Sequence, residues 1–257
     1  MDFQLAEQMF LENGLDYSRE LHEKLEIYSN FLVEYNEKVN LTAIIEPKEI
    51  WLKHFIDSIL FAKYIEIPEN STLIDVGTGA GFPSVPLKLY RNDIKLTLLD
   101  SLNKRIVFLD ELSTMLGIDV ETFHSRAEDA AKNENYREKY DFATARAVAA
   151  MPTLCEYCMG FVKKGGKFVA LKGTTEEISS FEKAVSILGG GNIKEIKYTL
   201  SGTESRKIFE IEKMDCIKDW INALGMSKDC YTEEELRELL NIFIEKQEEK
   251  DKQLVKE

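Results

Sequence analysis

The spacing of apolar residues along the chain changes near residue 70. Before that point apolar positions recur at steps of three and four, with Glu and Lys between them, as in the run from Leu21 to Tyr35. This period predicts amphipathic helices, one over residues 21–35 and a second over residues 46–65. The segment NLTAI breaks the pattern between them.

From residue 72 onward, short runs with strand character replace the helical spacing. Helical stretches over residues 102–116 and 176–188 separate some of them, and the turn SGTES joins the last two. The runs are TLIDV, KLTLLD, DVETF, DFATAR, KFVALK, IKEIKYTL and KIFEIEK. Alternating strands and helices predict an α/β, Rossmann-like fold, with a mainly parallel sheet covered on both faces. We expect seven strands, the last of them antiparallel because it closes a hairpin.

These changes of pattern divide the chain into three segments. Residues 1–66 form a helical annex, residues 67–213 form the sheet domain, and residues 214–257 form a C-terminal extension. The extension holds 12 acidic and seven basic side chains. Within it, Thr232 and Glu235 have the spacing of a capping box, which predicts a final helix.

Composition restricts the compartment and the kinds of site. No apolar run approaches the roughly 18–20 residues that cross a bilayer, and the N-terminus lacks the features of a signal peptide. We therefore expect a soluble, cytoplasmic protein. Cys155 and Cys158 form a lone C-x-x-C inside an apolar helical run, and the three histidines are scattered. This favours buried thiols over redox chemistry or a metal site.

The stretch DVGTGAGFPSVPLKL, residues 75–89, follows the first predicted strand. Gly77, Gly79 and Gly81 would form a turn into a helix, where free backbone N–H groups can face a ligand. A dinucleotide fingerprint requires a small residue at the position that Phe82 holds. The pattern instead resembles the first motif of S-adenosylmethionine-dependent methyltransferases, in which an acidic residue, here Asp75, precedes G-x-G-x-G. A carboxylate suits the cationic part of that cofactor.

Two prolines follow the glycines almost at once. We expect Pro83 and Pro86 in the first helical turn, where an N–H group has no intrahelical acceptor and its loss costs little. They would stiffen the loop that presents the glycines.

Two other predicted strand ends carry residues that suit the same cofactor. Asp100 ends the run KLTLLD and can accept hydrogen bonds from both ribose hydroxyls. Ala127 and Glu128 follow DVETF and could flank an adenine ring. Taken singly, these features also fit a turn without a ligand, a surface acid and a helix start with stabilising acids. Together, at successive strand ends, they favour S-adenosylmethionine as the cofactor.

Seven segments, taken in order, give a family resemblance. They are NEKVNLTAI, WLKHFIDSI, DVGTGAGFPSVPLKL, LLDSLNKRIVFL, SRAED, DFATARAVA and GGKFVALKG. Over about residues 15–213 the chain resembles the bacterial GidB (RsmG) family, the 16S ribosomal RNA guanine-N7 methyltransferases. The resemblance implies that Gly77, Phe82, Ala127 and Glu128 contact the cofactor. It also implies that Arg146 lies at the cofactor or target pocket.

The implied reaction requires little acid–base chemistry. Guanine N7 already carries a lone pair that accepts hydrogen bonds, and the sequence offers no convincing general base. Catalysis would rest on alignment of the reacting atoms at roughly 3 Å. Because the product purine is cationic, an acidic edge to the pocket can help. Arg146 is our candidate catalytic residue, since a guanidinium can stack on a base or pair with a phosphate. The alternative is an ion pair with Asp100, Glu128 or Asp141.

Two further side chains lie near each other on the second predicted helix. His54 and Asp57 are three residues apart and share one side of it. They would form either an interface pair or an RNA contact.

The net charge of −13 is unusual for a protein that binds a polyanion. Local basic residues could still form a basic mouth on the acidic body, namely Lys163, Lys164, Lys167, Lys172, Arg126, Arg146, Arg206 and Lys207. We therefore expect a monomer that acts on 16S ribosomal RNA within a small-subunit particle. The alternatives are a methyltransferase of the same fold with a small-molecule or protein substrate, and a non-catalytic scaffold.

Overall fold

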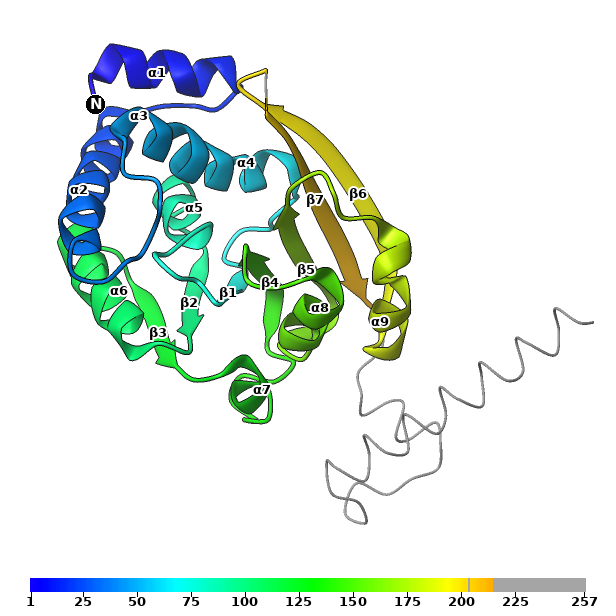
Figure 1. The fold of residues 1–257 in the computed structure, drawn as a ribbon. Helices are drawn as coiled ribbons and strands as arrows, with labels where there is room; N and C mark the ends of the chain where they lie inside the picture. Colours follow the sequence, from blue (N-terminus) through cyan, green and yellow to red (C-terminus); the bar gives the residue numbers. More distant parts are fainter. Residues whose placement is uncertain (203, 215–257) are drawn as a thin grey trace, which may run out of the picture. The chain divides into compact units, whose positions relative to one another are not determined.

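A central sheet organises the protein, whose structure is a computed structural model that describes residues 1–202 and 204–214 (Figure 1). Its strands are β1 (Thr72–Val76), β2 (Lys95–Asp100), β3 (Val120–His124), β4 (Tyr140–Arg146), β5 (Val162–Lys172), β6 (Gly190–Leu200) and β7 (Glu204–Lys213). Each predicted run forms one of these strands. The predicted helix after Thr232, with its capping pair, lies outside the described residues.

The strands lie in the order β3-β2-β1-β4-β5-β7-β6. Strands β1 to β5 pair in parallel, and β7 runs antiparallel to both β5 and β6. The predicted mainly parallel sheet of seven strands with an antiparallel last strand is therefore confirmed. Because β1 lies between β2 and β4, the chain order reverses at its carboxyl end. Open α/β sheets bind their ligands at such a switch point.

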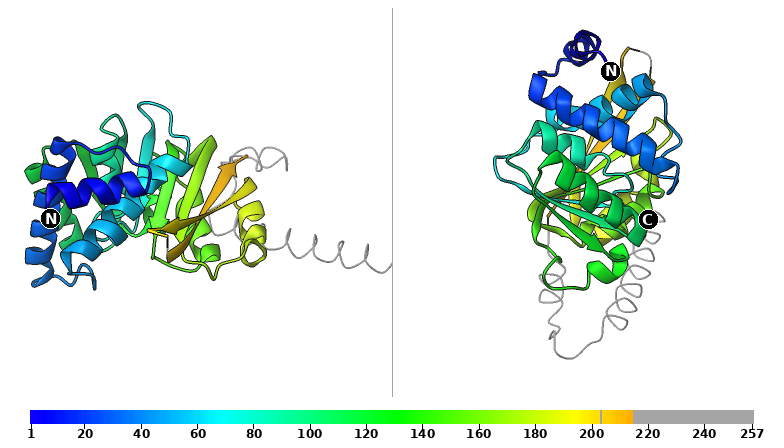
Figure 2. Two further views of the ribbon diagram at one scale, coloured as in Figure 1. Left: turned by 90° about the horizontal axis from the view of Figure 1, so that it is seen from above. Right: turned by 90° about the vertical axis from the view of Figure 1, so that its left-hand side faces the viewer.

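Helices cover both faces of the sheet (Figures 1 and 2). They are α1 (Phe3–Glu12), α2 (Arg19–Asn36), α3 (Pro47–Glu49), α4 (Asp57–Tyr64), α5 (Ser84–Tyr90), α6 (Asn103–Leu116), α7 (Ala127–Ala130), α8 (Met151–Met159) and α9 (Glu182–Ile187). A π-helical segment, Ile50–Ile56, joins α3 to α4, and a 3₁₀ turn, Ile178–Ser180, precedes α9. None of the helices in the described part of the chain is long and apolar enough to cross a membrane.

Two of the predicted helices are less regular than their periodicity indicates. The helix expected over residues 46–65 contains the π-helical segment, whose wider turn apolar spacing does not reveal. The helix expected over residues 176–188 breaks at Phe181, where the backbone leaves helical geometry. The Phe181 ring is buried and lies edge-on against Phe209 of β7, with ring centroids 5.0 Å apart.

Two apolar cores lie on opposite faces of the sheet. Strand β5 contributes to both, because successive side chains of a strand point to opposite faces. Its Val169 and Leu171 join the core under α2, α4, α5 and α6, while Phe168 and Ala170 join the core under α7, α8 and α9. Full burial of a Val, Leu or Phe side chain stabilises a fold by about 1.5–3 kcal/mol. The helical annex and the sheet thus share a continuous core.

The two cysteines of the C-x-x-C motif are buried in the second core. Burial raises the pKa of Cys155 to about 12, so its thiol stays protonated at neutral pH. Both are free thiols, in agreement with the prediction of structural cysteines. Across residues 1–202 and 204–214, no group of three or more His, Cys, Asp or Glu side chains is placed to hold a metal ion.

Candidate active site

The glycine-rich loop lies at the switch point, directly after β1. Both Gly77 and Thr78 donate backbone hydrogen bonds to the carbonyl of Leu99, at 2.8 and 3.1 Å. Gly77 has a φ of +70° and Gly81 a φ of +94°, a region that side chains disfavour. A Cβ atom on Gly77 would also lie 2.8 Å from a methyl group of Val148, and one on Gly81 would lie 2.8 Å from the Tyr28 hydroxyl. Both positions therefore require glycine.

Asp75 supports this loop from beneath. Its carboxylate is fully buried and accepts a hydrogen bond from the Thr78 hydroxyl at 2.9 Å. Burial raises the pKa of Asp75 to about 7. Its Oδ1 atom and the Ser84 hydroxyl have no hydrogen-bond partner within the described residues. Asp75 is not among the residues that line the cavity described below, and its role toward the cofactor stays a prediction.

Asp100 ties the loop to the end of β2. It accepts hydrogen bonds from the backbone N–H groups of Gly79 and Leu102, both at 2.9 Å. The Arg105 guanidinium lies 3.2 Å from the same carboxylate. Asp100 therefore lies where the sequence predicted it, against the glycine loop at the ligand-binding edge of the sheet. Its contact with a ribose stays a prediction.

The two prolines lie close to their predicted positions. Helix α5 begins at Ser84, so Pro86 is in its first turn and Pro83 is the residue that precedes it. The peptide bond between Phe82 and Pro83 is cis.

Phe82 joins the loop to the helical annex. Its ring is largely buried and stacks on Tyr28 on one side and on His54 on another, with ring centroids 5.3 and 4.3 Å apart. The Tyr28 hydroxyl donates to the carbonyl of Ala80. The arginine at the end of β4, Arg146, places its guanidinium carbon 5.0 Å from the centre of the Phe82 ring. Phe82 is thus held by aromatic packing, and its contact with a cofactor stays a prediction.

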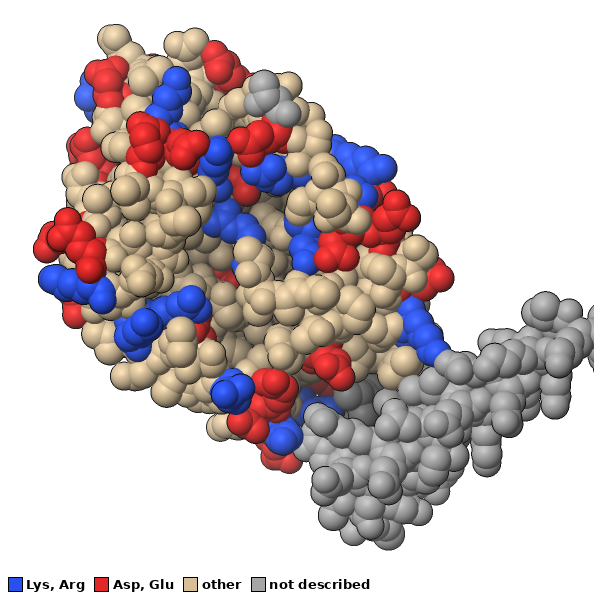
Figure 3. Space-filling view, in the orientation of Figure 1, with Lys and Arg blue, Asp and Glu red and all other residues tan. Residues whose placement is uncertain are grey.

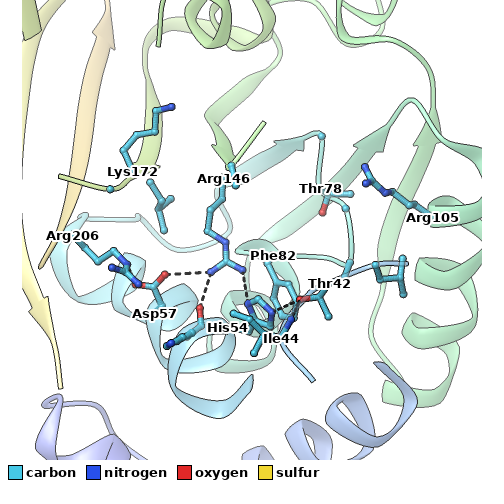
Figure 4. Close-up of a pocket in the computed structure, with 18 of the residues that line it drawn as sticks. Thr42, Ile44, His54, Asp57, Thr78, Phe82, Arg105, Arg146, Lys172 and Arg206 are labelled. Carbon is cyan, nitrogen blue, oxygen red and sulfur yellow. Dashed lines mark hydrogen bonds and ion pairs between the residues drawn. The ribbon is translucent and has the colours of Figure 1, made fainter. Parts of the chain in front are cut away.

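Arg146 is fixed by several acceptors of the annex (Figure 4). One terminal nitrogen lies 3.3 Å from the Lys53 carbonyl and 3.3 Å from an Asp57 carboxylate oxygen. The other lies 3.3 Å from Nδ1 of His54. The ion pair is therefore with Asp57, and not with Asp100, Glu128 or Asp141 as the alternative interpretation expected. The π-helical segment and the start of α4 supply all these acceptors, and π-helical turns are frequent at functional sites.

His54 is neutral and has a defined tautomer. Burial, and next the charge of Arg146, lower its pKa to about 3. A guanidinium can only donate hydrogen bonds, so Nδ1 of His54 accepts from Arg146. The ring proton is therefore on Nε2, which lies 2.9 Å from the Thr42 hydroxyl. His54 and Asp57 form an interface with Arg146, and this fits the first of the two predicted roles.

A cavity of about 550 Å³ opens between the glycine loop and the annex. Its lining residues are Leu41, Thr42, Ile44, Lys53, His54, Asp57, Gly77, Thr78, Gly79, Ala80, Phe82, Arg105, Arg146, Ala147, Leu171, Lys172, Gly173, Tyr198 and Arg206. Five of the lining side chains are basic and Asp57 is acidic. Figure 3 shows basic side chains gathered in this hollow. The Asp57 carboxylate is already bound by Arg146 and by the Tyr198 hydroxyl, at 3.3 and 2.8 Å, so it does not give the pocket a free acidic edge.

Only some of the basic residues that were predicted to form one mouth line the cavity. Lys172 and Arg206 line the cavity with Arg146. Lys163 pairs with Asp141 near the opposite end of β5, and Lys167 pairs with Glu210. Lys167 is four residues before Leu171, the β5 partner of Arg146, which is about 13 Å along a strand. The lysines at the start of β5 therefore do not belong to the mouth of the cavity.

Ala127 and Glu128 lie apart from this cavity. They begin the short helix α7, which packs beside α8 (Figure 1). Glu128 is exposed, and its charge raises the pKa of Tyr157. Neither residue is in the cavity lining, so the contact with an adenine ring stays a prediction.

Several site residues were not singled out from the sequence. Tyr198, from β6, reaches Asp57 across the sheet edge. The acceptor at Lys53 is its backbone carbonyl, and the identity of a side chain does not indicate that its backbone will act as an acceptor. Thr42 lies in the NLTAI segment, which is part of one of the seven segments that carry the family resemblance but was given no role there. The presence of NLTAI among those segments is the one feature of the sequence that could have drawn attention to Thr42.

The strand order, the glycine loop at the switch point of β1 and the adjoining polar cavity define a Rossmann-like class I methyltransferase. Within that class the chain belongs to the GidB family. The family model described as rRNA small subunit methyltransferase G matches residues 21–208.

Curated relatives cover most of the chain, and each is named ribosomal RNA small subunit methyltransferase G. One from Clostridium botulinum (strain Eklund 17B / Type B) is 52% identical over 217 residues, which cover 82% of this chain and 91% of the relative. One from Lactobacillus helveticus (strain DPC 4571) is 50% identical over 198 residues, with 75% and 82% covered. One from Alkaliphilus metalliredigens (strain QYMF) is 47% identical over 196 residues, with 75% and 82% covered.

Proposed function

We propose that this protein transfers a methyl group from S-adenosylmethionine to N7 of a guanine in 16S ribosomal RNA. Family membership supports the reaction class, and the name of the relatives supports small-subunit ribosomal RNA as the substrate. The observation that carries the proposal is the cavity beside the glycine loop, with its five basic side chains and neutral His54. The proposal includes action as a monomer in the cytoplasm, on a small-subunit particle.

The residues at the glycine loop fit the cofactor. A Cβ atom on Gly79 would meet nothing within 4 Å, so the loop backbone faces open space there. Asp75, fully buried, supports the loop from behind through its hydrogen bond with the Thr78 hydroxyl. We propose that Gly77, Gly79, Gly81 and Phe82 hold the methionine part against the start of α5.

The remaining predicted residues would hold the nucleoside part. In this proposal Asp100 accepts hydrogen bonds from the ribose hydroxyls, and Ala127 and Glu128 flank the adenine ring. When bound, S-adenosylmethionine supplies an activated methyl group on a positively charged sulfur.

Arg146 is the proposed catalytic residue on the target side, and it can also contact the cofactor. Because Asp57, His54 and the Lys53 carbonyl fix its guanidinium, it can orient an incoming base without first losing side-chain freedom. The neutral state of His54 does not limit this chemistry, since N7 attacks through a lone pair and loses no proton. Lys172 and Arg206 at the mouth suit the phosphates that flank the target nucleotide.

The test is a mass-spectrometric analysis of nucleosides from 16S ribosomal RNA. A strain that lacks the gene should lose one 7-methylguanosine per 16S molecule. Re-expression of the wild-type chain should restore it, and re-expression of Gly77→Asp should not. Undiminished 7-methylguanosine in the deletion strain would overturn the proposal and favour a small-molecule or protein substrate.

A further inference from the structure

The NLTAI segment holds Thr42 in a fixed position at the cavity wall. The Asn36 side chain accepts hydrogen bonds from the backbone N–H groups of Leu41 and Thr42, at 2.6 and 2.9 Å. It also donates to the Thr42 carbonyl at 3.0 Å. These three bonds involve only the backbone of the segment. The Thr42 side chain is thereby left to face the cavity, which it lines.

The hydrogen bonds around the Thr42 hydroxyl define what it can still do. Its oxygen accepts from the Ile44 backbone N–H at 3.0 Å. It also accepts from Nε2 of His54 at 2.9 Å, because Arg146 forces the proton of that ring onto Nε2. A hydroxyl has two acceptor lone pairs and one proton to donate. With both lone pairs in use, Thr42 presents a single donor to the cavity.

A single, donor-only group suits one edge of guanine. On that edge guanine presents two acceptors, N7 and O6, whereas adenine presents N7 and a donor amino group. The lone pair of N7 must stay free to attack the methyl group. A forked guanidinium tends to bind N7 and O6 together, and both terminal nitrogens of Arg146 are already engaged. One hydroxyl can engage O6 and leave N7 free.

We propose that the Thr42 hydroxyl donates a hydrogen bond to O6 of the target guanine and so selects guanine against adenine. This inference rests on the proposed function. Adenine at the same place would set its amino hydrogens against the hydroxyl proton, and neither group could accept. Thr42 is then a substrate-binding residue, while Asn36 and His54 are positioning residues that fix its location and its donor role.

The test combines two variants with two substrates. Thr42→Val keeps the β-branched shape and removes the hydroxyl, and Thr42→Ser keeps the hydroxyl. The substrates are unmethylated small-subunit particles reconstituted with guanine, or with 2-aminopurine, at the target nucleotide. The analogue retains N7 and lacks O6. The readouts are kcat/KM for methyl transfer, and the Kd for S-adenosylmethionine measured by calorimetry.

We expect Thr42→Val to lower kcat/KM on guanine roughly 10- to 100-fold, as for a site that loses a specific hydrogen bond to its substrate. Thr42→Ser should stay within about 3-fold of wild type by the same reasoning. The wild-type chain should lose a similar factor on 2-aminopurine, and Thr42→Val should lose nothing further on that substrate. The cofactor Kd should be unchanged in both variants.

Three results would overturn the inference. The kcat/KM of Thr42→Val on guanine could equal that of wild type. Its kcat/KM could fall by the same factor as that of wild type when 2-aminopurine replaces guanine. Its Kd for S-adenosylmethionine could be higher than that of wild type. A misfolded variant is identified by its melting temperature, and the wild-type comparison of guanine with 2-aminopurine then decides: an equal rate on both overturns the inference. Failure of the proposed function gives a different outcome, because wild type itself would then leave the guanine unmethylated.

Discussion

The two walls of the cavity are built in different ways. The proposed cofactor wall, residues 77–80 and Phe82 with Asp100 behind them, comes from one short stretch and the end of the next strand, joined by backbone hydrogen bonds and by the Asp100 carboxylate. The target wall takes Thr42, His54, Arg146 and Arg206 from segments spread over the chain. The first wall depends on backbone conformation, and the second on long-range contacts between side chains. Substitutions in the two walls should therefore fail in different ways.

The largest effect is expected on the cofactor wall. Gly77→Asp places a side chain at a φ of +70°, with its Cβ 2.8 Å from Val148, and it adds a negative charge to the loop. We expect S-adenosylmethionine affinity to fall at least about 100-fold, or about 3 kcal/mol, measured by calorimetry. Gly117→Asp is the matched control, because Gly117 has a φ of +61° but nothing within 4 Å of its Cβ position. Equal cofactor affinity in the two variants would contradict the prediction.

On the target wall, the largest effect is expected for Arg146. Arg146→Ala should reduce methyl transfer roughly 100-fold, the magnitude of removing a positioned electrostatic group. Its cofactor Kd should change less than about 3-fold if the arginine acts on the target. The variant also leaves the buried Asp57 without its closest cation, which costs up to about 3–5 kcal/mol of unfolding free energy. Arg206, whose Nε is 3.9 Å from Asp57, remains and reduces that cost.

Arg146→Lys separates charge from geometry at the same position. A single ammonium group cannot reach Asp57, His54 and the Lys53 carbonyl together, so we expect stability to recover more than the rate. If Arg146→Ala loses cofactor affinity by the same factor as rate, Arg146 belongs to the cofactor wall instead.

A smaller effect separates the mouth of the cavity from the far end of β5. Arg206→Ala should lower kcat/KM on small-subunit particles by roughly 3- to 10-fold and flatten its dependence on salt, as expected for a lost phosphate contact. Lys163→Ala is the matched control, since Lys163 pairs with Asp141 away from the cavity. It should stay within about 2-fold of wild type. A larger loss in Lys163→Ala than in Arg206→Ala would contradict this assignment.

At neutral pH the smallest effect is expected at His54, whose protonation state should not change there. Because its pKa is lowered to about 3, its ring signals in NMR should not titrate between pH 5 and 8. In Arg146→Ala the pKa should rise but stay below 6.5, since burial is the larger cause. A midpoint between pH 6 and 7 in the wild-type chain would contradict the neutral tautomer.

The same shift gives the sign of a stability effect. Below pH 6.5 the unfolded chain binds a proton at His54 more readily than the folded chain does. The contribution of His54 to the free energy of unfolding is therefore complete above pH 6.5 and is lost as the pH falls toward 3. Urea unfolding of wild type and His54→Asn at pH 5 and pH 8 measures it. The cost of the substitution should be smaller at pH 5.

The sequence predicted the cofactor wall better than the target wall for a physical reason. The positive φ angles of Gly77 and Gly81 require glycine, so the loop leaves a local signature. The strands β1 and β2 are buried runs with a clear period, so the position of Asp100 could be inferred as well. By contrast, the ion pair of Arg146 with Asp57 depends on a π-helical segment and on how the annex packs against the sheet. Neither leaves a local pattern, and the three acids considered as partners for Arg146 were all incorrect.

The basic lining of the cavity has a consequence for the release of product. Methyl transfer moves one positive charge from the sulfur to the purine, so a neutral guanine enters and a cation must leave. The carboxylate in the lining, Asp57, is already bound by Arg146 and Tyr198. The lining Lys and Arg side chains are themselves paired with carboxylates, so the methylated base gains no counter-ion from the residues that line the cavity. We expect methylated particles to compete poorly with unmethylated ones, so that the enzyme distinguishes its substrate from its product by charge.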